Sequence, residues 1–522
     1  MFTCRPLMNF HEAFRYAADG RMNIKQITLQ TGQMNRVILS FLVAVCLFFS
    51  TAAVRAEDVQ IPSVNLQKEI HLQLLEIAVA NFDKSYTRQY MRLKNSRSTP
   101  DYGLELALSY LMVKRFRDNF AGVSWENTQN LSFRKQDNAF TVKDVEAYEE
   151  SVRNGTLEQK LTMLRPKIPN YISYRREMLE QLKGSATEAE PYPFRLLKEG
   201  SRGEDVDSLK LFMQEQGYLD KYSPINGEFD FELTEAVKNY QFDKGLKPDG
   251  MVGRLTYDLI FKTHESKAVS IARTMIRMNH PGLYGGDSYV FVNIPKMEMN
   301  VYSGRKSVLQ SNVVVGRTDR QTPRLSSRID NVILNPSWTA PVTVSEKDYL
   351  PMLRKDRFYL AKKGITIYLA GEEVDPSELT QEDLTADGFK KFRIVQRPGN
   401  NNAMGRYKFN FPNKESIFLH STNSPGKFRN ASRMYSSGCV RVQKSNELAK
   451  YLLRDELSPD KVDKIIESER TTWLRLEHKV PIYLAYWTSY IAENGKVYYL
   501  PDIYSLDVPD SRLPPDLLNL FK

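Results

Sequence analysis

The chain has 522 residues, of which 41% are hydrophobic and 26% are charged. This composition excludes a disordered protein, and at about 150 residues per domain the length accommodates three or four domains. The formal net charge of +10 is spread along the chain without a long run of like charges. Since no nucleic-acid-binding module accompanies this charge, we expect no nucleic acid among the partners.

An apolar segment near the start of the chain is predicted to export the protein. From Val37 the sequence reads VILSFLVAVCLFFSTAAVRAED, with basic residues before it and small residues at its end. This order is typical of a secretory signal peptide, with Ala56 at the expected cleavage point. A run of about 17 to 25 apolar residues can also span a bilayer, so an uncleaved anchor is the alternative. We therefore expect residues 1–56 to be a signal peptide or a membrane anchor.

Residues 57–190 are predicted to form a helical scaffold domain. In LQKEIHLQLLEIAVANF, the residues Leu66, Ile70, Leu74 and Ile77 recur at a spacing of three or four, which places them on one helix face. The stretch GLELALSYLMVKRF continues the helical pattern, and no polar constellation typical of a site accompanies it. The loop GSATEAEPYPF then indicates a domain boundary, because small, acidic and proline residues occur together.

Residues 191–262 are predicted to form a small module of three helices. Residues 227–234 and 250–256 are a near-repeat in which a glycine turn leads into a helix near a threonine. The stretches GEDVDSLKLFMQEQGYL, FELTEAVKNYQFDKGL and DGMVGRLT resemble the peptidoglycan-binding type 1 domain. Asp230 departs from that family, which usually has a second glycine there. A three-helix linker that binds nothing is the alternative.

Residues 263–522 begin with one more helix and then change to strands. SYVFVNIPKMEMNVYSG and KSVLQSNVVVGR alternate apolar and polar residues, and Gly304 lies in the turn between them. A charged stretch at about 342–397 interrupts the strand pattern and is predicted to be a helical insertion. Such an insertion is either a lid over a site or a structural addition. The expected fold class is therefore α+β and multidomain, with a mainly β catalytic domain.

The chain contains three cysteines, of which Cys4 and Cys46 lie in the leading segment. Once that segment is removed, Cys439 has no disulfide partner within the chain, so it is a core residue, a metal ligand or a reactive thiol. The sequence SSGC suits a tight turn, because Gly438 permits positive φ. A helix is expected to begin at Ser445, and a position just before a helix can lower a thiol pKa below about 8.5.

A reactive thiol needs a base, and His420 is the candidate. It ends a strand pattern nineteen positions before Cys439, so adjacent strand ends would bring the two together. The alternatives are a buried cysteine and a histidine that only satisfies its hydrogen bonds. We expect no metal, because one cysteine and scattered histidines fall short of a four-ligand set.

The pattern IFLHST…SSGCVRV looks like the active-site signature of the L,D-transpeptidases, the family with a YkuD-type catalytic domain. The similarity runs from about Tyr289 to Leu500 and includes VVVGRTDRQTP, NPSWTAP and GRYKFNFPN. With the wall-binding module and the insertion, the chain most resembles the large multidomain Gram-negative members. The resemblance implies a periplasmic enzyme without cofactors whose partners are peptidoglycan stem peptides and glycan strands, with inner-membrane association if the leading segment is retained.

The resemblance also implies catalytic roles. Cys439 would be the nucleophile and His420 its general base, oriented by the backbone carbonyl of Ser421. The backbone N–H groups of Gly438 and Cys439 would be the oxyanion donors, with the Tyr407 hydroxyl as a side-chain donor.

Two further residues are implied in substrate binding. Arg441 stands where many relatives have asparagine, and its fork of donors suits a substrate carboxylate; a solvated arginine paired with Glu447 is the alternative. Ser437 replaces the histidine that many members carry before the glycine, which leaves His420 as the only imidazole base.

The reaction that the family implies is attack of Cys439 on the meso-diaminopimelate carbonyl of a tetrapeptide donor, followed by a 3→3 cross-link. A hydrolase that uses the same site and a non-catalytic wall-binding scaffold are the alternatives. A papain-like protease is disfavoured, because its histidine should follow the cysteine and only His478 does so.

Overall fold

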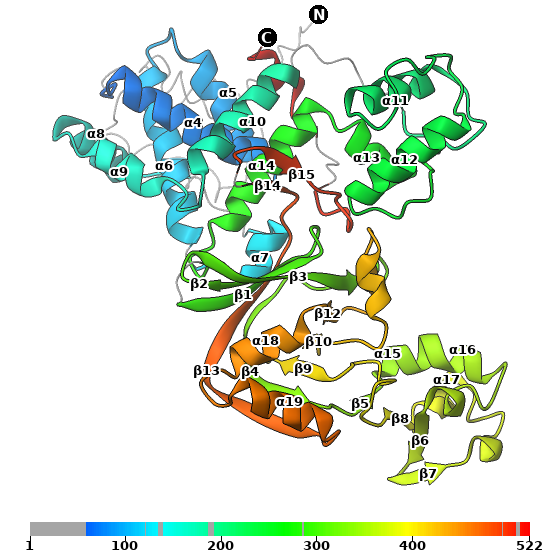
Figure 1. Ribbon diagram of the computed structural model, residues 1–522. Helices are drawn as coiled ribbons and strands as arrows, with labels where there is room; N and C mark the ends of the chain where they lie inside the picture. The colour runs from blue at the N-terminus through cyan, green and yellow to red at the C-terminus, as the bar shows by residue number, and fades with distance from the viewer. Residues whose placement is uncertain are drawn as a thin grey trace, which may run out of the picture.

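The computed structural model describes residues 59–120, 122–133, 139–185, 193–283, 287–492, 494–507 and 512–521. The predicted export segment at 1–56 lies outside these ranges, as does most of the predicted boundary loop. Within these ranges, no helix combines the length and apolar character needed to cross a membrane. Figure 1 shows a helical block and a three-helix module above a β-rich body, from which an insertion extends to one side.

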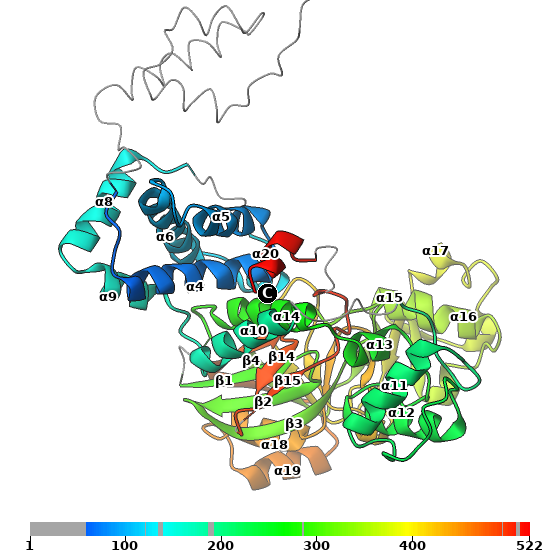
Figure 2. The ribbon, with the colours of Figure 1, turned by 90° about the horizontal axis from the view of Figure 1, so that it is seen from above.

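Helices α4 to α10 form the helical block, as predicted. They are α4 (Val64–Ala80), α5 (Lys84–Asn95), α6 (Tyr102–Phe120), α7 (Trp125–Asn130), α8 (Val142–Arg153), α9 (Leu157–Leu164) and α10 (Tyr171–Ser185). Ile70, Leu74 and Ile77 are buried in its core, which confirms the stripe read from the sequence. Two distant segments complete the block: α14 (His264–Met278) packs along α10, and α20 (Pro515–Asn519) packs on α5 (Figure 2).

The three-helix module consists of α11 (Glu204–Glu215), α12 (Phe231–Asp243) and α13 (Arg254–Ile260) around its own apolar core. Asp230, the departure from the family pattern, caps α12 by accepting a hydrogen bond from the Leu233 N–H at 2.8 Å. It also pairs at 2.6 Å with the buried ammonium group of Lys210. Where the family usually has a flexible glycine, Asp230 thus provides a helix cap and an ion pair that joins α11 to α12.

The β-rich body is a nine-stranded sheet in the order β11-β3-β12-β10-β9-β4-β13-β1-β2. Because β3 pairs with β2 as well as with β12, the sheet closes on itself around an apolar core. Its strands are β1 (Ser288–Asn293), β2 (Glu298–Ser303), β3 (Lys306–Gly316), β4 (Ser326–Leu334), β9 (Tyr407–Asn410), β10 (Leu419–His420), β11 (Met434–Ser436), β12 (Val440–Val442) and β13 (Thr472–Ala485). The core also takes side chains from α18 (Ser445–Leu452) and α19 (Pro459–Glu467), while β14 (Ser489–Ile491) and β15 (Val497–Tyr499) form a separate hairpin.

The insertion is mixed rather than purely helical, which corrects the prediction for residues 342–397. It has its own core and a four-stranded sheet in the order β5-β8-β6-β7. The strands are β5 (Trp338–Thr339), β6 (Ile365–Leu369), β7 (Glu372–Val374) and β8 (Arg393–Gln396). The helical pieces are short: α15 (Val342–Val344), the π-helical turn η2 (Ser345–Tyr349), α16 (Leu350–Leu353), η3 (Ala361–Lys363), η4 (Pro376–Glu378) and α17 (Ala386–Phe389). Strands this short, set between charged turns, give little periodic signal.

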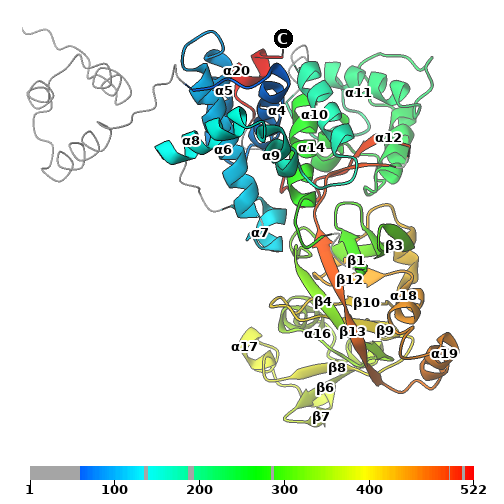
Figure 3. The ribbon, with the colours of Figure 1, turned by 90° about the vertical axis from the view of Figure 1, so that its left-hand side faces the viewer.

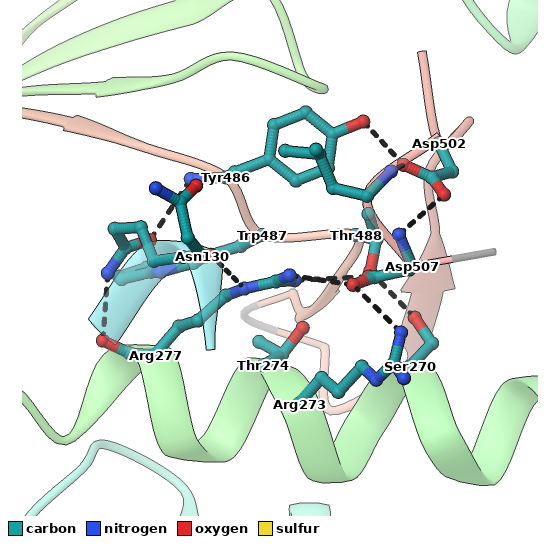
Figure 4. A network of polar contacts seen from close by, with 12 residues as sticks. Asn130, Ser270, Arg273, Thr274, Arg277, Tyr486, Trp487, Thr488, Asp502 and Asp507 are labelled. Carbon is teal, nitrogen blue, oxygen red and sulfur yellow. Dashed lines mark hydrogen bonds and ion pairs between the residues drawn. The ribbon is translucent and has the colours of Figure 1, made fainter. Parts of the chain in front are cut away.

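A buried polar network joins the helical block to the β-rich body. Arg277 on α14 forms two hydrogen bonds to Asp507, at 2.7 and 3.0 Å, and its Nε donates to the carbonyl of Gln129 at 2.8 Å (Figure 4). The Trp125 indole on α7 donates to the Leu484 carbonyl of β13 at 3.0 Å, and Figure 3 shows α7 reaching from the block toward the sheet. The helical block and the β-rich body are therefore held together by satisfied buried polar groups as well as by apolar contacts.

Candidate active site

Neighbouring strands place the predicted catalytic residues on one face of the closed sheet. Strand β10 lies between β9 and β12, and His420 is directly opposite Lys408 on β9 and Arg441 on β12. Residues directly opposite each other point to the same side, and alternate residues point to the other side. Their sequence neighbours Tyr407, Phe409, Leu419, Val440 and Val442 accordingly belong to the core inside the sheet. Lys408, His420 and Arg441 thus form a row. Cys439 lies in the bend just before β12, where the charges of Lys408 and Arg441 act on its thiol.

Cys439 lies in the turn between β11 and β12, and α18 begins at Ser445 as predicted. Gly438 has φ of 117°, a conformation that favours glycine, and a Cβ there would lie 3.1 Å from Cδ1 of Ile417. The Gly438 carbonyl accepts a hydrogen bond from Oγ1 of Thr322 at 2.8 Å, and the Gly438 N–H donates to Oγ of Ser436 at 3.2 Å. The turn is therefore fixed on both sides of the glycine.

The thiol of Cys439 is held in its protonated form. Its side chain is half-buried, with Sγ 4.0 Å from the Ser416 carbonyl oxygen. Burial raises the pKa of this thiol to about 11, although the backbone of Phe418 and the charges of Lys408 and Arg441 act to lower it. The expected lowering of the pKa does not occur, because desolvation of the thiolate outweighs the nearby cations.

The imidazole of His420 is held in its neutral form. Burial lowers its pKa to about 3, and the positive charges of Arg441 and Lys408 act in the same direction. The backbone of Met404 and of Ser421 acts to raise the pKa, so both residues lie near the ring. Nδ1 is nevertheless buried without a hydrogen-bond partner of good geometry. At neutral pH the thiol and the imidazole are therefore both uncharged, and the imidazole is able to accept a proton.

Three cations surround this neutral pair without a carboxylate partner. In the part of the chain that the structure describes, the charges that act on Arg441, Lys408 and Lys427 include no Asp or Glu. The alternative pair between Arg441 and Glu447 does not form, and Nε of Arg441 is buried without a hydrogen-bond partner. Nζ of Lys408 lies 4.1 Å from the ring centre of Phe418. The site therefore carries positive charge that an anionic ligand would neutralise.

Ser437 connects the cysteine turn to the insertion. Its Oγ accepts a hydrogen bond from Nη1 of Arg320 at 3.0 Å. The same guanidinium binds both carboxylate oxygens of Asp348, at 2.7 and 2.8 Å. Asp348 belongs to η2 of the insertion, and Ser437 lies two positions before Cys439. Arg320 therefore bridges the insertion and the cysteine turn.

The Tyr407 hydroxyl is not brought to the site. Its side chain lies on the core side of β9, where burial raises its pKa to about 12 and where Asp463 and Glu447 are the nearby acidic residues. The reason is strand alternation: Lys408, one residue later, occupies the face shared with His420. Tyr407 contributes instead through its carbonyl, which accepts from the Ser421 N–H at 2.9 Å.

Sequence reasoning missed Lys408, Arg320 and Thr322. Lys408 could have been found by extending the period-two alternation through GRYKFNF, since the residue next to a core-facing tyrosine must face outward. Arg320 and Thr322 precede the cysteine turn by more than 110 residues, and their contacts with it depend on tertiary structure.

The chemistry that these groups offer is nucleophilic acyl transfer to a thiol. Within the described ranges, no group of three or more His, Cys, Asp or Glu side chains is placed to hold a metal ion. A protonated thiol, a neutral imidazole, a fixed backbone turn and unpaired cations suit attack on the carbonyl of an anionic substrate.

Comparison with known proteins identifies two of the domains. Residues 287–466 match the family model described as "L,D-transpeptidase catalytic domain" (YkuD), and residues 202–260 match the model described as "Putative peptidoglycan binding domain". The chain therefore carries a YkuD-type L,D-transpeptidase catalytic domain and a peptidoglycan-binding type 1 domain, as the motifs predict.

Similar proteins cover only part of the chain. A protein of Haemophilus influenzae named "Putative L,D-transpeptidase" is 37% identical over 220 residues, which are 42% of this chain and 44% of that protein. A spore cortex-lytic enzyme of Halalkalibacterium halodurans is 29% identical over 105 residues, or 20% of this chain and 31% of the enzyme. The chain thus spans less than half the length of either relative.

Solved structures give only a distant likeness. A crystal structure of an L,D-transpeptidase from Xylanimonas cellulosilytica is 13% identical with a TM-score of 0.18, covering 56% of this chain and 100% of that one. One from Stackebrandtia nassauensis is also 13% identical with a TM-score of 0.18, covering 57% and 97%. A likeness of this size carries no argument about function.

Proposed function

We propose that this protein is a cell-wall acyltransferase that forms 3→3 cross-links between peptidoglycan stem peptides through a thioester on Cys439. The observation that carries the proposal is that His420 lies opposite Arg441 on β10 and β12, with the Cys439 thiol close enough to feel the charge of Arg441, within a matched L,D-transpeptidase domain. A scaffold protein has no use for a thiol beside a neutral imidazole and an unpaired arginine.

In the first half-reaction, Sγ of Cys439 attacks the carbonyl of the meso-diaminopimelate residue at position three of a tetrapeptide. The thiol proton passes to His420, which is uncharged at neutral pH and so free to accept it. When the tetrahedral intermediate collapses, the bond to the terminal D-alanine breaks, and His420 returns the proton to the leaving amine. The products are free D-alanine and an acylated Cys439.

In the second half-reaction, the side-chain amine of another diaminopimelate attacks the thioester. An amide bond forms, the C–S bond breaks, and the amine loses one proton, so that the thiol of Cys439 is restored. Water in place of the amine would make the protein a hydrolase that releases a tripeptide. Both outcomes use the same residues, and only the acceptor differs.

The unpaired cations are proposed to bind the carboxylates of the donor. Arg441 lies two residues beyond Cys439, interacts electrostatically with its thiol and has no acidic partner, so its fork can bind a carboxylate in bidentate fashion. Lys408 and Lys427 add further positive charge, since Lys408 interacts electrostatically with Cys439 and Lys427 with Arg441. A donor that carries free carboxylates close to the attacked carbonyl fits this set.

The oxyanion donor is proposed to be the Cys439 N–H. The Gly438 N–H already donates to Ser436, so it is less suited to that role than the sequence suggests. The Tyr407 hydroxyl does not serve as an oxyanion donor, because the tyrosine side chain lies in the core.

The remaining domains are assigned roles in reaching the substrate. The insertion is proposed to be a lid, since Arg320 ties it to Ser437 beside the nucleophile. The three-helix module is proposed to hold glycan strands near the site; a Cβ at Gly245 in this module would lie 3.6 Å from the Ala431 carbonyl, shortly before β11. The substrate and the predicted export segment together favour the periplasm.

The test is to incubate the protein with tetrapeptide muropeptides and to separate the products by liquid chromatography with mass spectrometry. We expect a dimer that lacks one alanine, formed by the parent and not by a folded Cys439→Ser variant, because a serine hydroxyl is far less acidic than a thiol. A tripeptide monomer without dimer would identify the hydrolase. If neither product forms, or if the variant matches the parent, the proposal fails.

A further inference from the structure

The peptide bond between Gly438 and Cys439 is held from behind by a threonine. Oγ1 of Thr322 donates to the Gly438 carbonyl at 2.8 Å and accepts from the Gly316 N–H at 2.9 Å. Thr322 is fully buried, so water does not compete for the hydrogen bonds of this hydroxyl. A trans peptide directs its carbonyl and its N–H to opposite sides, so a fixed Gly438 carbonyl also fixes the direction of the Cys439 N–H.

Thr322 is itself held by a tyrosine from the C-terminal end of the chain. The Thr322 N–H donates to Oη of Tyr504 at 3.1 Å, and that hydroxyl donates to the Gly316 carbonyl at 2.7 Å. Gly316 admits no side chain, because a Cβ would lie 2.2 Å from the Arg320 carbonyl oxygen. Tyr504 lies beyond residues 287–466, the range that matches the catalytic domain.

The hydrogen bonds continue from Tyr504 to the network that joins the domains. The Tyr504 N–H donates to Oη of Tyr486 at 2.8 Å, which donates to Asp502 at 2.5 Å. The Asp507 N–H also donates to Asp502, at 2.7 Å, and the Asp507 carboxylate binds Arg277 of α14. In Figure 4 the Tyr486 hydroxyl points to Asp502, and Arg277 rises from α14 toward Asp507.

We propose that Thr322 and Tyr504 are positioning residues for acyl transfer, which aim the Cys439 N–H at the oxyanion of the tetrahedral intermediate. The hydrogen bonds of Thr322 and Tyr504 are all buried, so the peptide between Gly438 and Cys439 has little freedom to rotate. An oxyanion donor works only when it points to where the negative charge develops. The proposal rests on the proposed function only in taking Cys439 as the residue that is acylated.

The test compares two reactions of the same thiol in the full chain. Acylation by p-nitrophenyl acetate forms a bond from Sγ to the acetyl carbon, releases p-nitrophenolate and passes through an oxyanion. Alkylation by iodoacetamide displaces iodide at carbon and forms no oxyanion. In both reactions the thiol proton goes to the base or to solvent. Mass spectrometry of the Cys439 peptide measures both rates, independently of any stem peptide.

We expect Thr322→Val to slow acylation by about tenfold to a hundredfold, because the hydroxyl that orients the peptide is lost. Tyr504→Phe should slow acylation in the same way, and Thr322→Ser, which keeps the hydroxyl, should stay within threefold of the parent. Alkylation should stay within twofold in all three variants. Tyr174→Phe is the matched control, since it removes a tyrosine hydroxyl that accepts from the Ile491 N–H at 3.2 Å in the helical block.

Two results would overturn the proposal. If acylation and alkylation change in parallel, the variants distort the thiol site in general and the residues are not oxyanion-positioning. If the acylation rates of both Tyr504→Phe and Thr322→Val stay within twofold of the parent, the orientation of the Gly438–Cys439 peptide does not depend on these hydroxyl groups. If Thr322→Val does not fold, Tyr504→Phe decides. If the parent does not act on muropeptides, the proposed function fails, but the comparison of acylation with alkylation still tests the role of Thr322 and Tyr504.

Discussion

Replacing Asp348 by asparagine should release the insertion from the turn that carries Cys439. Asp348 accepts two hydrogen bonds from Arg320, at 2.7 and 2.8 Å, and the two side chains are 35% and 13% exposed. A hydrogen bond to a charged group contributes about 1.5–3 kcal/mol when buried, and partial exposure lowers this value. We expect a loss of about 1–2 kcal/mol, which changes the ratio of attached to detached insertion by a factor of about 5–30.

Hydrogen exchange followed by mass spectrometry measures this change directly. Peptides from η2 and α16 should exchange faster in Asp348→Asn by about that factor, while peptides from the closed sheet should be unaffected. If closure of the insertion is part of turnover, kcat/KM on a tetrapeptide donor should fall by about fivefold or more.

The matched control is Asp356→Asn within the same insertion. Asp356 pairs with Lys362 at 2.7 Å, but these side chains are 38% and 66% exposed, so solvent screens the pair. This variant should stay within about twofold of the parent in both measurements. If Asp348→Asn exchanges no faster than Asp356→Asn, the Arg320 contact does not hold the insertion and the reasoning is wrong.

Three further outcomes are expected. Because burial raises the pKa of Cys439 to about 11, its alkylation by iodoacetamide should accelerate about tenfold per pH unit from pH 7 to 10, and a plateau near neutrality would contradict a protonated resting thiol. Arg441→Lys should lower kcat/KM without changing the melting temperature, and Arg441→Ala should cost about 2 kcal/mol or more in kcat/KM; values within twofold of the parent would make Arg441 a bystander. Deleting residues 196–261 should weaken retention on purified wall sacculi while the β-rich body stays folded, and unchanged retention would favour a linker.

The elements with strong local signals are predictable from the sequence. The stripe of Ile70, Leu74 and Ile77 predicts α4, and the alternation in residues 288–316 predicts the first three strands of the sheet. His420 and Cys439 were paired in the prediction because one ends a strand pattern and the other follows a glycine turn. In the structure His420 ends β10, and Cys439 lies in the turn just before the neighbouring strand β12.

What escaped prediction depends on tertiary contacts. The short strands of the insertion are stabilised by one another and by a shared core, so their sequences alone look like charged loops. The raised pKa of Cys439 depends on how much protein surrounds the thiol, which a helix following in sequence does not determine. The motif alone does not show which face of the sheet the Tyr407 side chain occupies. That face follows from the alternation of side chains along β9.

Both added modules leave and rejoin their host at neighbouring points. The insertion opens with β5 and closes with β8, and these strands pair with each other through Trp338 and Gln396. The three-helix module lies between α10 and α14, which pack side by side, and its own ends are joined by a bridge between Leu197 and Val252. The two ends of each module therefore lie close together where they join the rest of the chain. A module of another length or origin could replace it without changing the register of the sheet or the packing of the helices. Under the proposed function, an exchange of either module would change how the substrate is reached and leave the residues around the thiol in place.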